Sequence, residues 1–376
     1  MNRSDNNIFS GIVVLDVTKV LSGPLATRYL ADYGATVIKV EHPEKPDDSR
    51  NFPPLKNNWS GYFEMLNRNK EGVTLDFERP QDRNVFYQLC KKTDVVVENL
   101  TPGSLYKLKI DYDTLKKINR KLIYASISGV DQKSNRKYYD ISAQAESGLL
   151  SLSGTPDNPM KIGPAVVDTF AGVNLAFAIA SALFYRERTG KGQNITVSML
   201  GAAVQLLEQN IIDYSVSGKN PVRPGRGDAA IAPFGLFKTK DGFITIACGN
   251  EKLWNTFQMF LLKHKDFDTK KFLTNSLRLK NNVGLTFIIE EVFAHYKTTS
   301  LIQKIHSLSI PFGKVNEMSD IAHNRWFFEN GSLVKLKHNK LGNYITPGRP
   351  INFSSVKQTK LKNAPELGSD NKKYGL

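Results

Sequence analysis

The stretch "GIVVLDVTKVLSGPLATRYLADYGATVIKVE", residues 11–41, holds two apolar, β-branched runs with a helical pattern between them. "IVVLDV" (12–17) and "ATVIKVE" (35–41) have the composition of buried strands, and "GPLATRYLADYG" (23–34) has helical spacing. A strand, a helix and a strand in this order form a βαβ unit with parallel strands. The opening of the chain therefore predicts an α/β fold.

The same alternation continues to about residue 130. "VTLDF" (73–77), "DVVVENL" (94–100) and "LIYASIS" (122–128) read as buried strands, and "PQDRNVFYQLCKKT" reads as a helix that opens on Pro80. Helical patterns follow from Asp140 to about Leu152 and from Thr169 to about Thr189. Next come a strand in "QNITVSML" and a helix in "GAAVQLLEQNIIDYSVSG". We predict a doubly wound, Rossmann-like sheet.

A change of composition marks a second domain. The glycine- and proline-rich "SGKNPVRPGRGDAA" (217–230) is the predicted linker, and "FGLFKTKDGFITIACGN" (234–250) is a predicted hairpin with its turn at Lys240-Asp241-Gly242. Helices are expected over 251–310, and β-structure from "WFFENGSLVKL" (326–336) onward. The polar tail "LGSDNKKYGL" (367–376) is expected to fray.

Composition limits the function classes. The 376 residues are 40% hydrophobic, with a formal net charge of +15, but lysine and arginine are scattered among acidic residues. This favours a generally basic surface over a nucleic-acid site. The longest apolar stretch, 170–185, is interrupted by Asn174 and Ser181 and followed by "RERTGKG", so we expect a buried helix rather than a membrane span. "MNRSDNNIFSG" lacks a signal-peptide core, and we predict a soluble cytoplasmic protein.

Several familiar sites are missing from the sequence. The loop after the first strand has one glycine, Gly23, instead of Gly-x-Gly-x-x-Gly, and no Walker-type loop or Gly-x-Ser-x-Gly occurs. The two cysteines, Cys90 and Cys248, lack metal-binding partners at suitable spacing, so we expect neither a structural metal nor a disulfide framework. All six histidines lie outside residues 43–263, so no histidine base can come from that region.

A carboxylate is available there instead. Asp168 in "GPAVVDTFAG" (163–172) stands where a long apolar helix begins. The spacing predicts a capping aspartate that contributes about 1 kcal/mol. The free N–H groups and dipole of that helix end would also stabilise a carboxylate nucleophile, so the two roles are compatible.

Ten motifs, in this order, carry a resemblance over nearly the whole chain. They are "GIVVLDVTKVLSGPLATRYLADYGATVIKVEHP", "LNRNKEGVTLDFERPQ", "TDVVVENLTPG", "YASISG", "YYDISAQAESGLLSLSG", "VDTFAG", "RERTGKGQNITVSML", "APFGLFKTKDGFITIACGN", "IPFGKVNEMSDI" and "APELG". The chain resembles the class III CoA-transferases, the group of formyl-CoA transferase. That group also includes carnitine, citramalate and glutarate CoA-transferases and the related 2-methylacyl-CoA racemases.

The resemblance implies a CoA-transferase in which Asp168 is the catalytic nucleophile and no metal takes part. Coenzyme A, as an acyl-CoA, and a small carboxylic acid would be the substrates, with neither nucleic acid nor membrane as a partner. The implied fold has a large CoA-binding domain (1–220 and 320–376) and a small α+β domain (226–318). Two chains would form an interlocked homodimer.

The resemblance also implies a set of CoA contacts. They are Leu21, Ser22, His42, Leu75, Asp76, Phe77, Glu78, Asn99, Leu100, Thr101, Lys107, Ser128, Gly129, Val130 and Asp131. Some depart from the family pattern: Leu21 replaces a glutamine, and Lys107 replaces an arginine, which keeps the charge but loses the bidentate fork. "ACGNEKLW" (247–254) has Gly249 alone where formyl-CoA transferase has a glycine run, and the chain stops soon after "APELG".

Two alternatives remain. Racemases carry a histidine before an aspartate, whereas this chain has Tyr139 before Asp140, and a tyrosine with a pKa near 10 is a poor proton-transfer base at neutral pH. A non-catalytic protein of the same fold that binds CoA or a polyanion is the alternative from another class.

Overall fold

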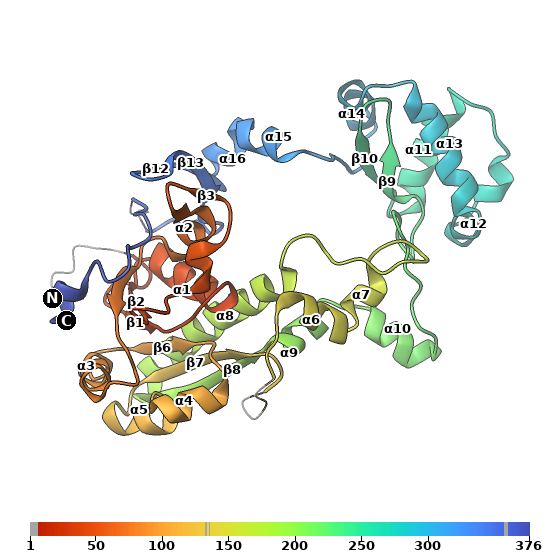
Figure 1. Cartoon of the computed structure of the whole chain (residues 1–376). Coiled ribbons are helices and arrows are strands. Elements are labelled where there is room, and N and C mark those ends of the chain that lie inside the picture. Colours follow the sequence, from red (N-terminus) through yellow and green to blue (C-terminus); the bar gives the residue numbers. More distant parts are fainter. Residues whose placement is uncertain (1–6, 132–133, 135, 357–359) are drawn as a thin grey trace. The chain divides into compact units, whose positions relative to one another are not determined.

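The computed structural model describes residues 7–131, 134, 136–356 and 360–376. The chain divides into two compact units (Figure 1). The first comprises Met1–Leu149, Ile162–Glu208 and Arg325–Leu376, and the second comprises Leu150–Lys161 and Gln209–Asn324.

The first unit is built on a six-stranded parallel sheet with the strand order β5-β2-β1-β6-β7-β8. Its strands are β1 (Val13–Asp16), β2 (Thr36–Glu41), β5 (Glu71–Thr74), β6 (Val95–Glu98), β7 (Ile123–Ser128) and β8 (Gln193–Ser198). Each of the six overlaps a run that the sequence predicts as a strand, and the α/β class is confirmed. β1 and β6 are neighbours, and the chain leaves them toward opposite edges of the sheet.

The helices of the first unit lie between these strands or after them in the chain. They are α1 (Ser22–Asp32), α2 (Gly61–Asn67), α3 (Pro80–Cys90), α4 (Pro102–Leu108), α5 (Tyr112–Ile118), α6 (Asp140–Glu146), α8 (Val166–Thr189), α9 (Met199–Gln205) and α16 (Arg325–Glu329). Short pieces complete the unit: η1 (Asp48–Asn51), η3 (Asn371–Tyr374) and the two-stranded pairs β3 (Leu55–Lys56) with β4 (Trp59–Ser60) and β12 (Leu333–His338) with β13 (Gly342–Pro347). α7 (Leu149–Leu152) lies where the chain passes from the first unit to the second.

Helices cover both faces of the parallel sheet. Alternate strand residues point to opposite faces, and Leu15, Ile38 and Val96 share a buried cluster with Phe86 of α3 and Leu115 of α5. Figure 1 shows α3, α4 and α5 below the sheet and α1 and α8 above it. Buried apolar side chains on both faces explain why the strands read as continuous apolar runs.

The second unit has its own core. β9 (Phe234–Lys238), β10 (Phe243–Ala247) and β11 (Phe312–Lys314) form an antiparallel sheet, and the predicted hairpin is its β9–β10 pair. The remaining elements are α10 (Asn210–Ser217), α11 (Glu251–Leu262), η2 (Thr269–Phe272), α12 (Asn275–Lys280), α13 (Asn282–Ala294), α14 (Thr298–Ser307) and α15 (Met318–His323). Trp254, Phe257, Ile289 and Phe293 are fully buried in its core.

The unit boundaries differ from the predicted domain limits. The predicted small domain, 226–318, falls inside the second unit, but that unit also takes in 150–161 and 209–225. The Arg223 guanidinium explains part of the difference, since it donates hydrogen bonds to the carbonyls of Ser151, Thr155 and Pro156 over 3.3, 2.8 and 2.7 Å. Because this contact joins segments about 70 residues apart in the sequence, no local sequence pattern predicts it.

Two predicted local structures are wrong. "WFFE" (326–329), expected as β-structure, lies in α16. The helix expected over 201–218 is two helices, α9 and α10, separated near Glu208, whose φ is +48°. A left-handed φ ends an α-helix, and the apolar spacing that continues through the break conceals it.

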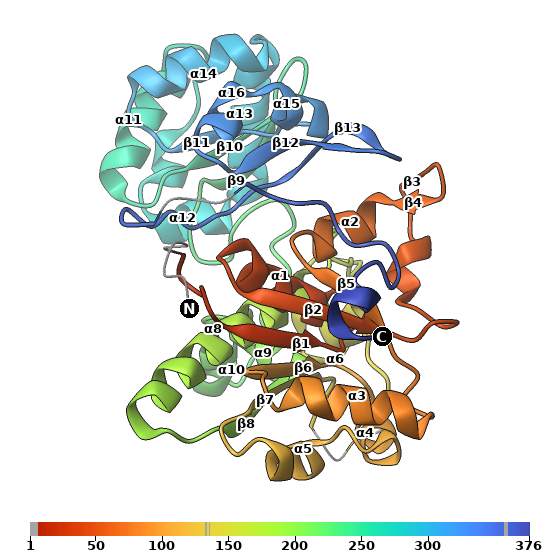
Figure 2. The same cartoon turned by 90° about the vertical axis from the view of Figure 1, so that its left-hand side faces the viewer.

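The C-terminal tail is also not frayed as expected. The Asp370 carboxylate accepts a hydrogen bond from the Gly72 N–H (2.8 Å), while the Asp370 N–H donates to the Gly72 carbonyl (2.9 Å). The Asn371 side chain accepts one from the Thr74 N–H (3.0 Å). The tail therefore lies along β5, the outer strand of the sheet, as Figure 2 shows, and satisfies backbone groups that an open edge would expose.

Among the described residues, one helix, α8, is long and apolar enough to cross a membrane by length and composition. One side of it is buried within the first unit, through Val167, Ala171, Leu175 and Ile179.

Candidate active site

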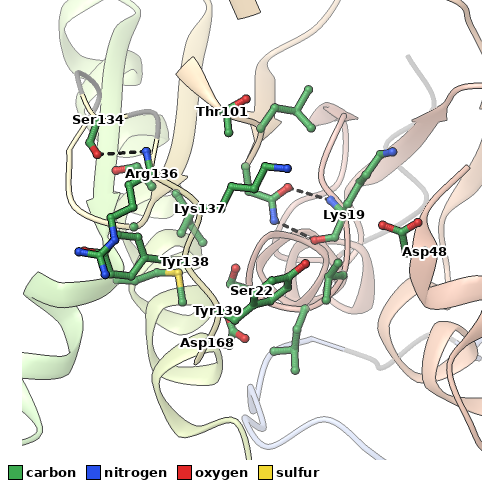
Figure 3. A pocket seen from close by; sticks show the side chains of 18 residues that line it. Lys19, Ser22, Asp48, Thr101, Ser134, Arg136, Lys137, Tyr138, Tyr139 and Asp168 are labelled. Carbon is green, nitrogen blue, oxygen red and sulfur yellow. Dashed lines mark hydrogen bonds between the residues drawn. The ribbon is translucent and has the colours of Figure 1, made fainter. Parts of the chain in front are cut away.

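A cavity of about 320 Å³ opens at the carboxyl ends of β1, β6 and β7 (Figure 3). The loop after β1 supplies Leu21, and the first residue of α1 is Ser22. The loop after β6 supplies Asn99 to Thr101, and β7 ends at Ser128, with Gly129 directly after it. Asp168 enters from the first turn of α8. In parallel α/β sheets, ligands bind in the crevice where the connections diverge to opposite edges, and this cavity lies beside that point, between β1 and β6.

Asp168 does not cap α8, contrary to the capping prediction. The helix begins at Val166, three residues before the predicted start, and Asp168 is its third residue. One oxygen of the Asp140 carboxylate accepts hydrogen bonds from the N–H groups of Val167 (2.9 Å) and Asp168 (3.3 Å). A carboxylate from α6 thus satisfies the helix end, which leaves the Asp168 side chain to face the cavity.

The surroundings of Asp168 shift its acidity. Burial and, next, the nearby Asp140 carboxylate raise the pKa of Asp168 to about 6, and a hydrogen bond from the Ser22 hydroxyl acts in the opposite direction. Figure 3 places Ser22 and Asp168 at the same end of the cavity. At pH 7 and above, Asp168 is therefore mainly ionised, while being held in a less hydrated position than a surface carboxylate.

Tyr62 of α2 lies close enough to this group to be influenced by it. Burial, followed by the charges of Asp168, Asp47 and Asp140, raises the pKa of Tyr62 to about 12. Its phenol is therefore protonated at neutral pH. The sequence gives no signal for Tyr62 in this role, because α2 follows the β3–β4 turn and is not one of the helices that directly follow a sheet strand.

Close contact between two helices positions the Ser22 end of α1. A Cβ added at Gly172 of α8 would come within 2.6 Å of the Ser22 carbonyl oxygen. Glycine at this position therefore lets α8 approach the start of α1, which brings Ser22 and Asp168 together.

The structure gathers about half of the predicted site residues around the cavity. Those lining it are Leu21, Ser22, Asn99, Leu100, Thr101, Ser128, Gly129 and Asp168. The others lie outside it: His42, Leu75, Asp76, Phe77, Glu78, Lys107, Val130 and Asp131. Their CoA contacts stay predictions.

Packing explains several residues of the second group. Leu75 and Phe77 belong to the buried cluster that includes Phe86, so their side chains fill the core. His42 Nε2 lies 3.6 Å from Asp76 Oδ1 at the neighbouring ends of β2 and β5. The Asp131 carboxylate accepts a hydrogen bond from the Ser134 N–H over 2.8 Å.

Other lining residues were not identified from the sequence as site residues. They are Lys19, Val20, Asp48, Ile127, Ser134, Arg136, Lys137, Tyr138, Tyr139 and Met199. Five of them come from the segment 134–139, which has neither strand nor helix periodicity; its one usable signal was the pair of adjacent cations, Arg136 and Lys137. Tyr139, the residue weighed against a racemase histidine, is 66% exposed.

No cluster of three or more potential metal-ligating side chains occurs among the residues that the structure describes. Cys90 and Cys248 are both buried and unbridged, and burial raises the pKa of each thiol to about 12.

Comparison with known proteins extends over nearly the whole chain. Residues 9–371 match the sequence model of CoA-transferase family III. The chain is 35% identical over 363 residues to succinyl-CoA:glutarate CoA-transferase from Mus musculus, covering 95% of this chain and 83% of that protein. It is 34% identical over 351 residues to acetyl-CoA:oxalate CoA-transferase from Acetobacter aceti, covering 92% and 89%.

A solved structure agrees with the sequence matches. The crystal structure of a CAIB/BAIF family protein from Brucella suis superimposes with a TM-score of 0.87 at 33% identity, covering 98% of both chains. Because fold and sequence agree over this length, the chain belongs to CoA-transferase family III, enzymes that move CoA between carboxylic acids.

Proposed function

We propose that Asp168 is the covalent nucleophile of this transferase. The carboxylate oxygen attacks the thioester carbonyl of an acyl-CoA, the C–S bond breaks, and an acyl-aspartyl anhydride and CoA thiolate result. The thiolate then attacks the aspartyl carbonyl, which gives an aspartyl-CoA thioester and releases the donor acid. An acceptor carboxylate repeats the two steps in reverse, and the Asp168 carboxylate is restored.

One observation carries this proposal: a carboxylate with a pKa near 6 faces the cavity, while a second carboxylate, Asp140, binds the helix N–H groups. A carboxylate attacks in its ionised form, so the mechanism requires no histidine base. Partial removal from water favours the thioester route over hydrolysis. The Ser22 hydroxyl can donate a hydrogen bond to the carboxylate and to the oxygen charge that develops on the aspartyl group.

We propose small dicarboxylates as acceptors and a short acyl-CoA, such as succinyl-CoA, as donor. Relatives of the chain are named for glutarate and oxalate as acids and for succinyl-CoA and acetyl-CoA as donors. A matrix of purified enzyme, several acyl-CoA donors and mono- and dicarboxylic acids, read by mass spectrometry of the CoA products, tests this choice. Preference for monocarboxylic acceptors would contradict it.

The nucleophile is tested by trapping. Enzyme mixed with succinyl-CoA and quenched with borohydride or hydroxylamine should carry one modified aspartate on the peptide containing 163–172. Asp168→Ala should abolish both labelling and exchange while the fold, followed by circular dichroism, is retained. Asp113→Ala on the exposed side of α5 is the matched control and should label normally. Undiminished exchange in Asp168→Ala would exclude the mechanism.

We further propose that a second copy of the chain covers the outer side of α8. Phe177, Phe184 and Val173 are 73%, 62% and 40% exposed on this helix. Phe177 and Phe184 follow Val173 by four and eleven residues, which puts the three side chains on one side of the helix. A row of exposed apolar side chains on one helix indicates a contact surface, and the homodimer implied by the family resemblance supplies the occupant.

A further inference from the structure

The loop between β1 and α1 holds a residue in a strained conformation. Val20 has φ +69°, and a β-branched residue at positive φ is a genuine outlier that persists only where its surroundings enforce it. The next two residues, Leu21 and Ser22, line the cavity. A forced conformation therefore stands two residues before Ser22, whose hydroxyl hydrogen-bonds Asp168.

Side chains from other elements hold the loop at successive backbone groups. The Lys39 ammonium donates to the Thr18 carbonyl over 2.9 Å. Asn99 binds the backbone of Lys19 twice, accepting from its N–H (2.8 Å) and donating to its carbonyl (2.8 Å); Figure 3 draws both bonds. The Val20 N–H donates to Asp47 Oδ1 over 3.1 Å.

Asp47 is itself fixed in place. It is fully buried, and its Oδ2 lies 3.0 Å from the ammonium of Lys39, which is also fully buried. Its Oδ1 also accepts hydrogen bonds from the backbone N–H (3.0 Å) and hydroxyl (2.8 Å) of Ser49. One carboxylate thus joins β2, the turn before η1, and the Val20 peptide. An ordinary buried ion pair needs no bond to a strained loop, so this arrangement calls for a further explanation.

We propose that Asp47 is a positioning residue for CoA transfer: with Asn99, it holds Val20 in its strained conformation and so keeps the Ser22 hydroxyl on the Asp168 carboxylate. This inference rests on the proposed role of Asp168.

The surroundings of Asp168 determine the direction in which its pKa should move if this role is correct. The groups that act on it are Asp140 from α6, Ser22 from α1 and, within range of its charge, Tyr62 from α2. Burial and Asp140 raise the pKa of Asp168, whereas Ser22 lowers it. Displacing Ser22 therefore raises that pKa further. If loss of the Asp47 charge acted on Asp168 through electrostatics alone, it would instead lower the pKa of Asp168.

Asp47→Asn separates these outcomes. The new amide turns its oxygen toward Lys39 and its NH2 toward the N–H groups of Val20 and Ser49, where two donors then face each other. We expect the acidic limb of the pH profile of kcat/KM to move to higher pH, as it does in Ser22→Ala. A shift of one pH unit corresponds to a roughly tenfold loss of kcat/KM on that limb. The double variant should move no further than Ser22→Ala alone.

A matched control and a rescue guard against general destabilisation. Asp32→Asn breaks another buried ion pair of the first unit, with Arg68 (2.6 Å); it should lower Tm without moving the limb. Val20→Gly should restore the limb in the Asp47→Asn background, because glycine adopts φ +69° without being forced. The proposal is overturned if Asp47→Asn behaves like Asp32→Asn, shifts the limb downward, adds its full shift to Ser22→Ala, or resists rescue by Val20→Gly.

A second variant covers the case in which Asp47→Asn does not fold. Asn99→Ala removes both bonds to Lys19 without leaving a buried charge, and it should move the acidic limb in the same direction; an unmoved limb would count against the proposal. Succinyl-CoA labelling of the wild-type enzyme keeps the two proposals apart. If wild-type Asp168 carries no label, the nucleophile assignment fails. If the wild-type enzyme is labelled normally but the acidic limb of the pH profile does not move in the variants, only the positioning role of Asp47 is excluded.

Discussion

The proposed role of Asp168 as nucleophile makes two demands that oppose each other. A nucleophilic carboxylate must be ionised, yet it must sit where water is scarce. Burial and Asp140 raise the pKa of Asp168 to about 6, while Ser22 limits the rise. The ionised form is thus retained at neutral pH, but the folded protein holds it less favourably than the unfolded chain does.

Replacing this carboxylate should therefore stabilise the protein. The folded-state pKa of Asp168 lies above its usual value of 3.8, so the folded state binds more protons and its stability falls as pH rises from about 4 to about 6. Asp168→Asn removes this loss. We expect the free energy of unfolding to rise by on the order of 1–2 kcal/mol at pH 7.5, a figure reduced to allow for the partial solvent exposure of Asp168. This gain should vanish below about pH 4.

Thermal unfolding of both proteins from pH 3.5 to pH 8 measures this difference. Asp113→Asn on the exposed side of α5 is the control and should show no gain that grows with pH over the same range. If the difference in Tm between wild type and Asp168→Asn were the same at every pH, ionisation of Asp168 would not be what destabilises the folded protein.

Helix α8 contributes to the site through its spacing from α1 as well as through Asp168. Alanine normally stabilises a helix by about 1 kcal/mol relative to glycine. At Gly172, however, a Cβ would lie 2.6 Å from the Ser22 carbonyl oxygen, well inside van der Waals contact. The helices must then separate at the place where Ser22 meets Asp168.

We therefore expect Gly172→Ala to lower both Tm and kcat/KM, the latter by roughly tenfold or more, because displacements of about 1 Å in an active site have effects of this size. The control is Gly201→Ala in α9, where the nearest atom, Ser198 Cβ, is 3.4 Å away. That variant should keep wild-type activity. Steady-state kinetics and thermal unfolding on the three proteins decide the matter, and equal behaviour of the two alanine variants would refute the spacing argument.

The molecule as a whole leaves the outer side of α8 apolar and exposed. If a second copy covers it, Phe177→Lys should lower the molar mass measured by light scattering toward the 42.1 kDa of one chain. Tyr106→Lys on α4, which replaces a side chain that is 63% exposed, should leave the mass unchanged. A wild-type protein that is monomeric at micromolar concentration, or one that binds lipid vesicles through this helix, would contradict the dimer.

Local patterns predicted much of this architecture, and contacts distant in sequence account for most of the misses. β-branched runs identified the six sheet strands, because buried parallel strands are apolar throughout. The position of Asp168 at a helix start was also readable, but its predicted capping role was wrong, since the cap comes from Asp140, 28 positions away. The strained Val20 and the buried Lys39–Asp47 pair likewise depend on segments that sequence spacing does not connect.

The position of the tail along β5 has a consequence for folding during synthesis. Asp370 reaches Gly72 across 298 positions, and ribosomes add about 5–20 residues per second. The outer strand of the nascent sheet therefore waits roughly 15–60 s for its cover. During that interval its unpaired edge can join another unfinished chain, so chaperone demand during synthesis should depend on this late-arriving segment more than on any part of the active site.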